Sequence, residues 1–163
     1  MPLVDSLLTA VVRSGDQATC GARRVGAFPI KTLTLEVGDA RPLGLGAGSL
    51  ALLALLPDAE VKSAIERNGA VLAQHPNFAP ALMWDHVHST RAAGYSLNDG
   101  QMMPEMAAIG MGIRDPQGAV VAALSIAGLR SRLQPPRRAT LRDSLAREVA
   151  EIENAIVLRD KSG

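Results

Sequence analysis

Aromatic residues are almost absent from this 163-residue sequence, in which Phe, Tyr and Trp together make up 2%. Proteins that stack nucleic-acid bases or enclose quaternary ammonium groups need several such rings. The scarcity argues against both kinds of binding surface. The core must therefore consist of the aliphatic residues and Met, since the hydrophobic class still reaches 47%. The aromatic residues are Phe28, Phe78, Trp84 and Tyr95.

Charge of one sign and cysteine are lacking as well. The chain has 17 basic and 16 acidic side chains, for a net charge of +1, whereas a domain that neutralises phosphates carries a clear basic excess. The single Cys20 cannot form an intramolecular disulfide, which is typical of a reducing compartment. We therefore expect that this chain does not itself contact DNA.

Long hydrophobic runs are missing too. The apolar stretches at residues 50–56 and 119–126 are much shorter than a membrane span. The apolar patch at residues 7–12 follows Asp5 and is preceded by no Lys or Arg, so it does not match a secretory signal. We expect a soluble, cytoplasmic protein without a membrane partner.

The length fits one domain around one core. Turn residues divide the chain into strands, then helices, then a hairpin and a last helix, which predicts an α+β fold with one antiparallel sheet and helices packed on it. Residues 38–42 form a turn cluster, and Asp115 and Gly118 fit the tight turn of the hairpin. The strands are expected at residues 7–13, 18–25, 30–35, 106–113 and 119–126.

Helix boundaries follow from prolines, glycines and capping residues. Pro57 stops the first helix, and Asp58 is placed to cap the second. Gly94 terminates the third, while Thr140 and Asp143 form a capping-box-like start of the last. The helices are expected at residues 49–56, 58–69, 80–93 and from 140 onward. The apolar stripe of the last helix consists of Leu141, Leu145, Val149, Ile152 and Ile156.

The glycine-rich segment at residues 44–48 is the most informative local feature. It opens a helix whose first backbone N–H groups have no intrahelical partner, and such an end favours an anion. The glycines equally permit close helix packing. The spacing matches neither a phosphate-binding P-loop nor a dinucleotide fingerprint.

Polar residues near this helix start suggest the rest of a pocket. Ser125 is the one polar side chain of an apolar strand, and Ala123 and Ala127 share its face. Its hydroxyl either bonds to nearby backbone or lines a pocket. Asn98 and Asp99, in an expected loop before the hairpin, either close such a pocket or form an ordinary turn.

Other polar clusters give weaker indications. His86 and His88 would lie on different faces of a helix, so we expect exposed histidines and no metal site. Cys20 and His75 would make a nucleophile and base only if the fold joined them. No cofactor motif is present. A basic cluster, expected to be a solvated loop or else an interface or phosphate contact, consists of Arg130, Arg132, Arg137 and Arg138.

Three segments in combination resemble the effector-binding domain of the IclR family of bacterial transcription regulators. They are residues 41–53 (RPLGLGAGSLALL), 93–99 (AGYSLND) and 118–128 (GAVVAALSIAG), the last followed by Ser-Arg-Leu at 131–133. Their order and spacing also match, over about residues 5–158. The resemblance implies a GAF-like fold, in which a curved antiparallel sheet flanked by helices holds a small organic effector.

The resemblance also implies which residues meet the effector. The backbone of Gly46 and Ala47 would bind its anionic group, which agrees with the helix-terminus argument. The departures are Ser49 where the family usually has Lys, and fewer polar groups elsewhere, which suggest an effector more apolar or bulkier than a two- or three-carbon acid. The rest of the pocket would be lined by Asn98, Met106, Ala108, Ser125 and Ala127.

Regulators of this family carry a winged helix-turn-helix ahead of this domain, for which residues 1–163 have no room. We expect residues 1–163 to be the effector-sensing half of a longer regulator that self-associates as a dimer or tetramer and binds DNA only through that further domain. A naturally stand-alone relative is the alternative. A second hypothesis is an enzyme that uses the helix terminus as an oxyanion or phosphate hole, but the lack of a nucleophile–base pair argues against it. A third is a GAF-like module of an unrelated signalling protein.

Overall fold

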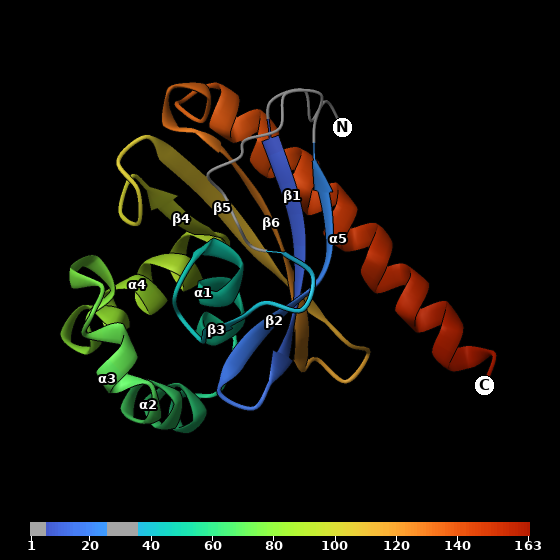
Figure 1. The fold of residues 1–163 in the computed structure, drawn as a ribbon. Coiled ribbons are helices and arrows are strands. Elements are labelled where there is room, and N and C mark those ends of the chain that lie inside the picture. Colours follow the sequence, from blue (N-terminus) through green and yellow to red (C-terminus); the bar gives the residue numbers. More distant parts are fainter. Residues whose placement is uncertain (1–5, 26–35) are drawn as a thin grey trace.

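The computed structural model describes residues 6–25 and 36–163, which form one antiparallel sheet with helices on both faces (Figure 1). Helices α1 to α4 cover one face, and the long α5 crosses the other. The predicted α+β architecture with a curved antiparallel sheet is confirmed. The strand expected at residues 30–35 lies outside the described residues. The sheet order is β3 (Ala40–Pro42), β2 (Gln17–Val25), β1 (Ser6–Ser14), β6 (Val120–Leu129), β5 (Met106–Arg114), β4 (Ser96–Asp99).

Alternate side chains of the central strand β1 serve the two faces of the sheet. Val11 packs in the core beneath α1, whereas Leu8 and Ala10 pack in the core beneath α5. On β6, Ala123 belongs to the first core and Ile126 to the second. The sheet thus separates two hydrophobic cores, and the hairpin predicted for residues 106–113 and 119–126 is confirmed as β5 and β6.

Helix α1 (Ala47–Ala54) is buried on every side, as expected for an apolar helix enclosed by a sheet and other helices. Two glycines of β5 make this possible. A Cβ at Gly110 would collide with the Ala47 carbonyl, and one at Gly112 would collide with Leu55. The missing side chains therefore let α1 lie directly on the sheet.

The remaining helices on this face form an outer layer. They are α2 (Asp58–Arg67), α3 (Gly69–Leu72), the short 3-10 helix η1 (Pro76–Phe78) and α4 (Pro80–Ala93). The predicted bounds of α4 are confirmed, and Gly94 ends it in the left-handed conformation at φ 83°. Asp58 is the first residue of α2 rather than its cap, because Pro57 holds the N-cap position.

Helix α5 (Arg137–Lys161) follows the 3-10 helix η2 (Arg130–Arg132). Its predicted stripe is confirmed: Leu141, Leu145 and Val149 are buried, and the two isoleucines pack against the same core. The predicted start at Thr140 is wrong. The N-cap is Pro136, whose carbonyl already accepts the backbone N–H of Thr140.

Two segments expected as turns or loops are edge strands. Residues 40–42 of the predicted turn cluster pair with β2, where Pro42 is tolerated because an edge strand needs fewer N–H donors. Asn98 and Asp99 lie in β4 and pair with β5. Their turn-forming chemistry acts one step later, because the side-chain oxygen of Asn98 accepts the N–H of Gln101 at 3.1 Å.

The close approach of α1 to β5 gives a first prediction. Replacement Gly110→Ala should lower the free energy of unfolding by about 1–3 kcal/mol, because the new methyl group overfills the contact with the Ala47 carbonyl. Urea denaturation measures this. Gly21→Ala on β2 is the matched control, since its Cβ would meet only an oxygen at 4.0 Å. Equal stabilities for the two variants would contradict the account.

Candidate functional site

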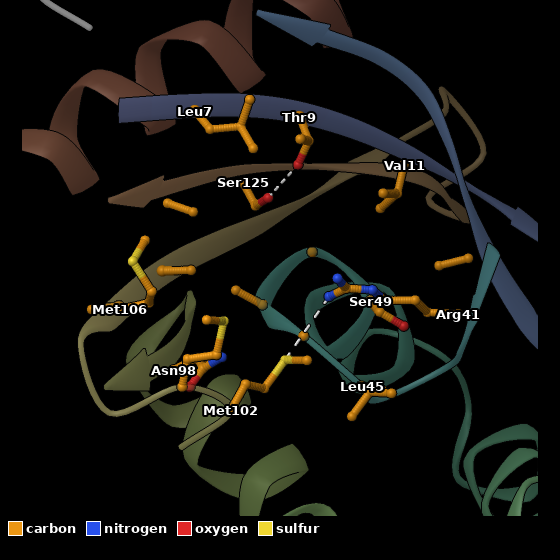
Figure 2. A pocket seen from close by; sticks show the side chains of 18 residues that line it. Leu7, Thr9, Val11, Arg41, Leu45, Ser49, Asn98, Met102, Met106 and Ser125 are labelled. Atoms are coloured by element: carbon orange, nitrogen blue, oxygen red, sulfur yellow. Dashed lines mark hydrogen bonds between the residues drawn. The ribbon is translucent and has the colours of Figure 1, made fainter. Parts of the chain in front are cut away.

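A cavity of about 160 Å³ lies between the N-terminus of α1 and the sheet (Figure 2). Its walls come from all six strands and from α1, so distant parts of the sequence meet there. The structure brings together all seven residues predicted to form a pocket. They are Gly46, Ala47, Asn98, Met106, Ala108, Ser125 and Ala127.

Sequence reasoning missed other lining residues, above all Arg41, Thr9 and Met102. Arg41 stands three residues before the glycine-rich segment, and a single Arg between apolar residues was the available signal. Thr9 had no such signal, because its contact with the site depends on how β1 pairs with β6. The further lining residues are Leu7, Val11, Ala18, Leu45, Gly48, Ser49, Met103 and Ala107.

Ser49 fixes the entry to α1. Its hydroxyl accepts the N–H of Gly44 at 3.0 Å and donates to the carbonyl of Pro42 at 2.9 Å. The chain then passes through Gly46 at φ 94°, a conformation that favours glycine. The first N–H groups of α1 follow, and these have no partner within the helix. The departure at Ser49 thus has a structural role, because its hydroxyl holds the helix start beside the cavity.

Two further contacts hold α1 in place. The Ser96 hydroxyl donates to the Ala47 carbonyl at 2.5 Å. At the other end, Arg91 donates to the carbonyls of Ala54 and Leu56, at 2.6 and 3.0 Å, and so satisfies carbonyls that the end of the helix leaves without intrahelical partners. Both ends of α1 are therefore tied to neighbouring elements.

Arg41 reaches into the mouth of the cavity from β3 (Figure 2). Its guanidinium is half-buried, and burial lowers its pKa although the charge of Asp39 partly offsets this. Within residues 6–25 and 36–163 it makes one hydrogen bond, to the thioether of Met102 at 3.9 Å, and no ion pair. A thioether is a weak acceptor, so most of its hydrogen-bonding capacity is unused.

Thr9 and Ser125 form a hydroxyl pair on the floor of the cavity (Figure 2). Their oxygens are 2.6 Å apart, and both residues are buried on the paired strands β1 and β6. The sequence left open whether Ser125 bonds to backbone or lines a pocket. The structure shows that it lines the cavity and that its partner is another side chain.

The segment between β4 and β5 covers one side of the cavity with Met102 and Met103. Asp99, just before this segment, connects it to the rest of the fold: its carboxylate accepts a hydrogen bond from Arg130 at 2.9 Å and forms an ion pair with Arg138 at 3.4 Å. Burial tends to raise the pKa of Asp99, but the hydrogen bond and charge of Arg130 outweigh it and lower the pKa. These two arginines are therefore attached to the fold rather than part of a solvated loop.

The remaining candidate residues do not form a second site. Cys20 is buried in β2, where burial raises the pKa of its thiol, and it donates to the carbonyl of Ala22. His75 is the N-cap residue of η1 in the outer helical layer, and no hydrogen bond joins it to Cys20 in the described part of the chain. His86 packs on Phe78 and binds the Asn77 carbonyl rather than lying in solvent, which corrects the expectation for that residue, whereas His88 is exposed.

Among the described residues, no group of three or more His, Cys, Asp or Glu side chains is placed to hold a metal ion. The helices of that part of the chain also include none with an apolar stretch long enough to cross a bilayer.

The sequence pattern described as "Bacterial transcriptional regulator IclR C-terminal" matches residues 24–154. The chain belongs to the IclR family. A curated relative, the HTH-type transcriptional repressor AllR of Klebsiella pneumoniae, is 28% identical over 165 residues, covering 95% of this chain and 57% of the relative. The HTH-type transcriptional regulator KipR of Bacillus subtilis is 23% identical, covering 94% and 61%.

Solved structures agree with this membership. The Agobacterium tumefaciens repressor BlcR has a TM-score of 0.80 at 27% identity, covering 94% of this chain and 61% of that one. The Thermotoga maritima IclR has a TM-score of 0.84 at 20% identity, covering 94% and 62%, which shows the shared fold. This IclR-family chain spans about three-fifths of the length of its curated relatives. They are named as transcription regulators, not enzymes.

The hydroxyl pair gives a second prediction. Thr9→Val and Ser125→Ala should each lower the free energy of unfolding by about 1–2 kcal/mol, because each leaves one buried hydroxyl without its partner. The double variant should lose less than the sum, since removing both leaves no orphan. A double-mutant cycle in urea measures the coupling, and strict additivity would show that the pair contributes nothing.

Proposed function

We propose that this chain is the effector-sensing and self-associating domain of an IclR-type regulator, and that a small organic acid binds in the cavity beside α1. The observation that carries this is the convergence of all seven expected residues on one cavity at the start of a buried helix. The helix end offers backbone N–H groups and a partial positive charge to the acid group.

The size and lining of the cavity define the class of effector. A volume of about 160 Å³ is similar to that of an engineered cavity that holds benzene. Most walls are Ala, Leu, Val and Met side chains, so they fit a compact apolar body. The effector is accordingly bulkier than a two- or three-carbon acid.

Regulation requires the effector to bind two arrangements of the protein with different affinity. The segment at residues 100–105 is a suitable responder, because its methionines line the cavity while Asp99 connects it to Arg130 and to Arg138 of α5. In this proposal DNA is bound by a separate winged helix-turn-helix domain, and the effector changes how such domains are arranged.

The enzyme alternative has no support in the cavity. Ser125 is the best candidate for a nucleophile among the hydroxyl groups of the cavity, but its hydroxyl is paired with that of Thr9. No His, Asp, Glu or Lys is among the described residues that line the site. General-base catalysis needs such a group within hydrogen-bond reach. The function therefore rests on binding.

Effector binding gives a third prediction. A monocarboxylic acid that fits the cavity should raise Tm by several degrees at a hundredfold excess over Kd. Ala127→Met fills the cavity from β6 and should abolish this shift while leaving Tm without ligand unchanged or higher. Differential scanning fluorimetry measures both effects.

The matched control is Ala119→Met, which adds the same side chain at an exposed position just before β6. It should retain the full shift. A shift that survives in Ala127→Met would show that the acid binds elsewhere.

Self-association is proposed through the end of α5. This helix is about 37 Å long and runs past the sheet (Figure 1). Beyond Val149 it has no fully buried residue, and Leu158 is 66% exposed. Ala155 is the midpoint of a helix face that carries Glu151 on one side and Arg159 on the other.

Antiparallel pairing of two copies about Ala155 would bring complementary groups together. Glu151 precedes Ala155 by as many residues as Arg159 follows it, so each would face the other across the pair. Leu158 and Ile152 are related in the same way; Ile152 packs partly against the core beneath α5, and its remaining exposed part would contact Leu158 of the second copy. Because all five residues lie on one side of the helix, a second copy of this chain fits the surface.

Leu158→Glu should therefore dissociate the complex, because it removes the largest apolar contact and adds like charges near the axis. Light scattering on a sizing column measures the mass. Asn154→Glu makes the same charge change off this face and should leave the mass unaltered. Glu151→Arg should weaken the complex, and adding Arg159→Glu should restore it; a mass insensitive to all of these variants would exclude the pairing.

A further inference from the structure

We propose that Arg41 selects the charge of the effector, and that the effector is a monocarboxylate whose single negative group binds this guanidinium and the start of α1. This inference rests on the proposed function of the cavity. It adds the number of negative charges on the ligand and the side chain that recognises them.

The Arg41 guanidinium has no carboxylate within ion-pair distance in the described part of the chain, and the charge of Asp39 acts on it only from farther away. Among the described residues, Arg41 makes no ion pair, whereas seven other arginines do, at positions 13, 23, 67, 91, 130, 138 and 142. Its one acceptor is the Met102 sulfur. A half-buried charge without a partner is unfavourable for the folded protein, and an anion from solution would relieve this.

The charge of Arg41 also lies beside the start of α1. A Cβ built on Gly46 would lie 3.0 Å from the Nη1 atom of Arg41, so the guanidinium stands beside the first turn of α1. The N–H groups of Arg41 and those at the start of α1 therefore lie beside the same part of the cavity. A carboxylate has two oxygens, which suits two separate sets of donors.

Asn98 provides an independent indication of a ligand. It is 8% exposed and lines the cavity from β4. Its side-chain oxygen accepts the N–H of Gln101, but its amide nitrogen has no partner among the described residues. The fully buried side-chain polar atom without a partner in the described part of the chain is Oε1 of Gln101, so the amide nitrogen of Asn98 is instead open to the cavity. The free N–H groups of Asn98 add a further donor to a site that has few acceptors.

The charge balance of the cavity lining limits the charge of the ligand. Of the described side chains that line the cavity, Arg41 is the one charged group. One carboxylate would neutralise it. A second negative charge would lie among Met and Ala side chains without compensation, which is strongly unfavourable. A neutral ligand would leave the guanidinium as it is. The balance therefore favours a monoanion with an apolar body.

Met102 occupies the place of the carboxylate oxygen in the free protein. Its sulfur is a weak acceptor at 3.9 Å from Nη1, so a carboxylate would displace it readily. Because Met102 belongs to the segment after Asp99, this exchange changes a contact of that segment and links charge recognition to the proposed response.

The test compares acids with their neutral amides of nearly the same shape. Suitable pairs are benzoate with benzamide and 3-methylbutanoate with 3-methylbutanamide, and malonate supplies a dianion. Isothermal titration measures Kd for the unaltered chain and for Arg41→Gln. Arg67→Gln is the control, since Arg67 is an exposed arginine on α2 that pairs with Asp16.

At least one acid should bind the unaltered chain about ten- to a hundredfold more tightly than its amide, the factor expected for a charge-assisted hydrogen bond. Arg41→Gln should remove that preference, and Arg41→Lys should retain part of it. Arg67→Gln should behave as the unaltered chain. Malonate should bind more weakly than the preferred acid.

A second readout separates a ligand-binding role from a structural one. Arg41→Met removes an unpaired half-buried charge, so Tm without ligand should stay the same or rise. An arginine that supports the fold would give a lower Tm instead. A fall of several degrees would therefore overturn the assignment even if acid binding were also lost.

Three other results would overturn the inference. They are equal affinity for acid and amide, an acid preference that survives Arg41→Gln, and no binding by any of the acids. Neutral compounds that bind, and that Ala127→Met excludes, would leave the cavity as the effector site while removing Arg41 from charge selection. The failure of this inference and of the proposed function are thus distinguishable.

Discussion

The direct contact between α1 and β5 is the constraint on which the site depends. Gly110 and Gly112 have no side chain between the strand and the helix, so the helix lies against the sheet along its length. Gly48 extends the same contact toward β1 and β6, where its Cβ would meet Val11 at 3.2 Å. With α1 at this depth, its first turn opens into the cavity rather than onto the surface.

Buried hydroxyl groups hold this arrangement where apolar packing alone would allow sliding. Ser49 joins the helix start to β3, and Ser96 joins it to β4. Thr9 and Ser125 join the two strands of the floor. Hydrogen bonds need defined geometry, whereas apolar contacts are not directional. The polar atoms of the core therefore fix the position of the cavity, and its aliphatic walls determine its shape.

Local signals in the sequence were sufficient for most elements. Pro80 and Gly94 mark the ends of α4 correctly, because each fixes the backbone at its own position. The helix start predicted at Thr140 was wrong, because its N–H is already bound by the carbonyl of Pro136, four residues earlier, inside the first turn of α5. Asn98 was placed in a loop by its turn propensity, whereas pairing with β5 decided the outcome.

The same distinction applies to the site. Gly46 and Ala47 follow from the local pattern of a helix start, and Ser125 and Asn98 from their polar side chains near it. The family resemblance added Met106, Ala108 and Ala127. Thr9 and Met102 reach the cavity only through long-range pairing and packing, which one sequence does not contain. Arg41 carried a local signal, but its lack of a partner is visible only when its surroundings are known.

The two parts of the proposed effector site, its donors at the start of α1 and its apolar walls, differ in how the sequence encodes them. At the α1 end they are largely main-chain N–H groups, which every residue except proline possesses, so most substitutions leave them unchanged. The walls around the apolar body are side chains of β1, β5 and β6, each replaceable by a single codon change. A lineage of such proteins could therefore acquire new effectors through drift in the strands while inheriting the same way of holding an acid.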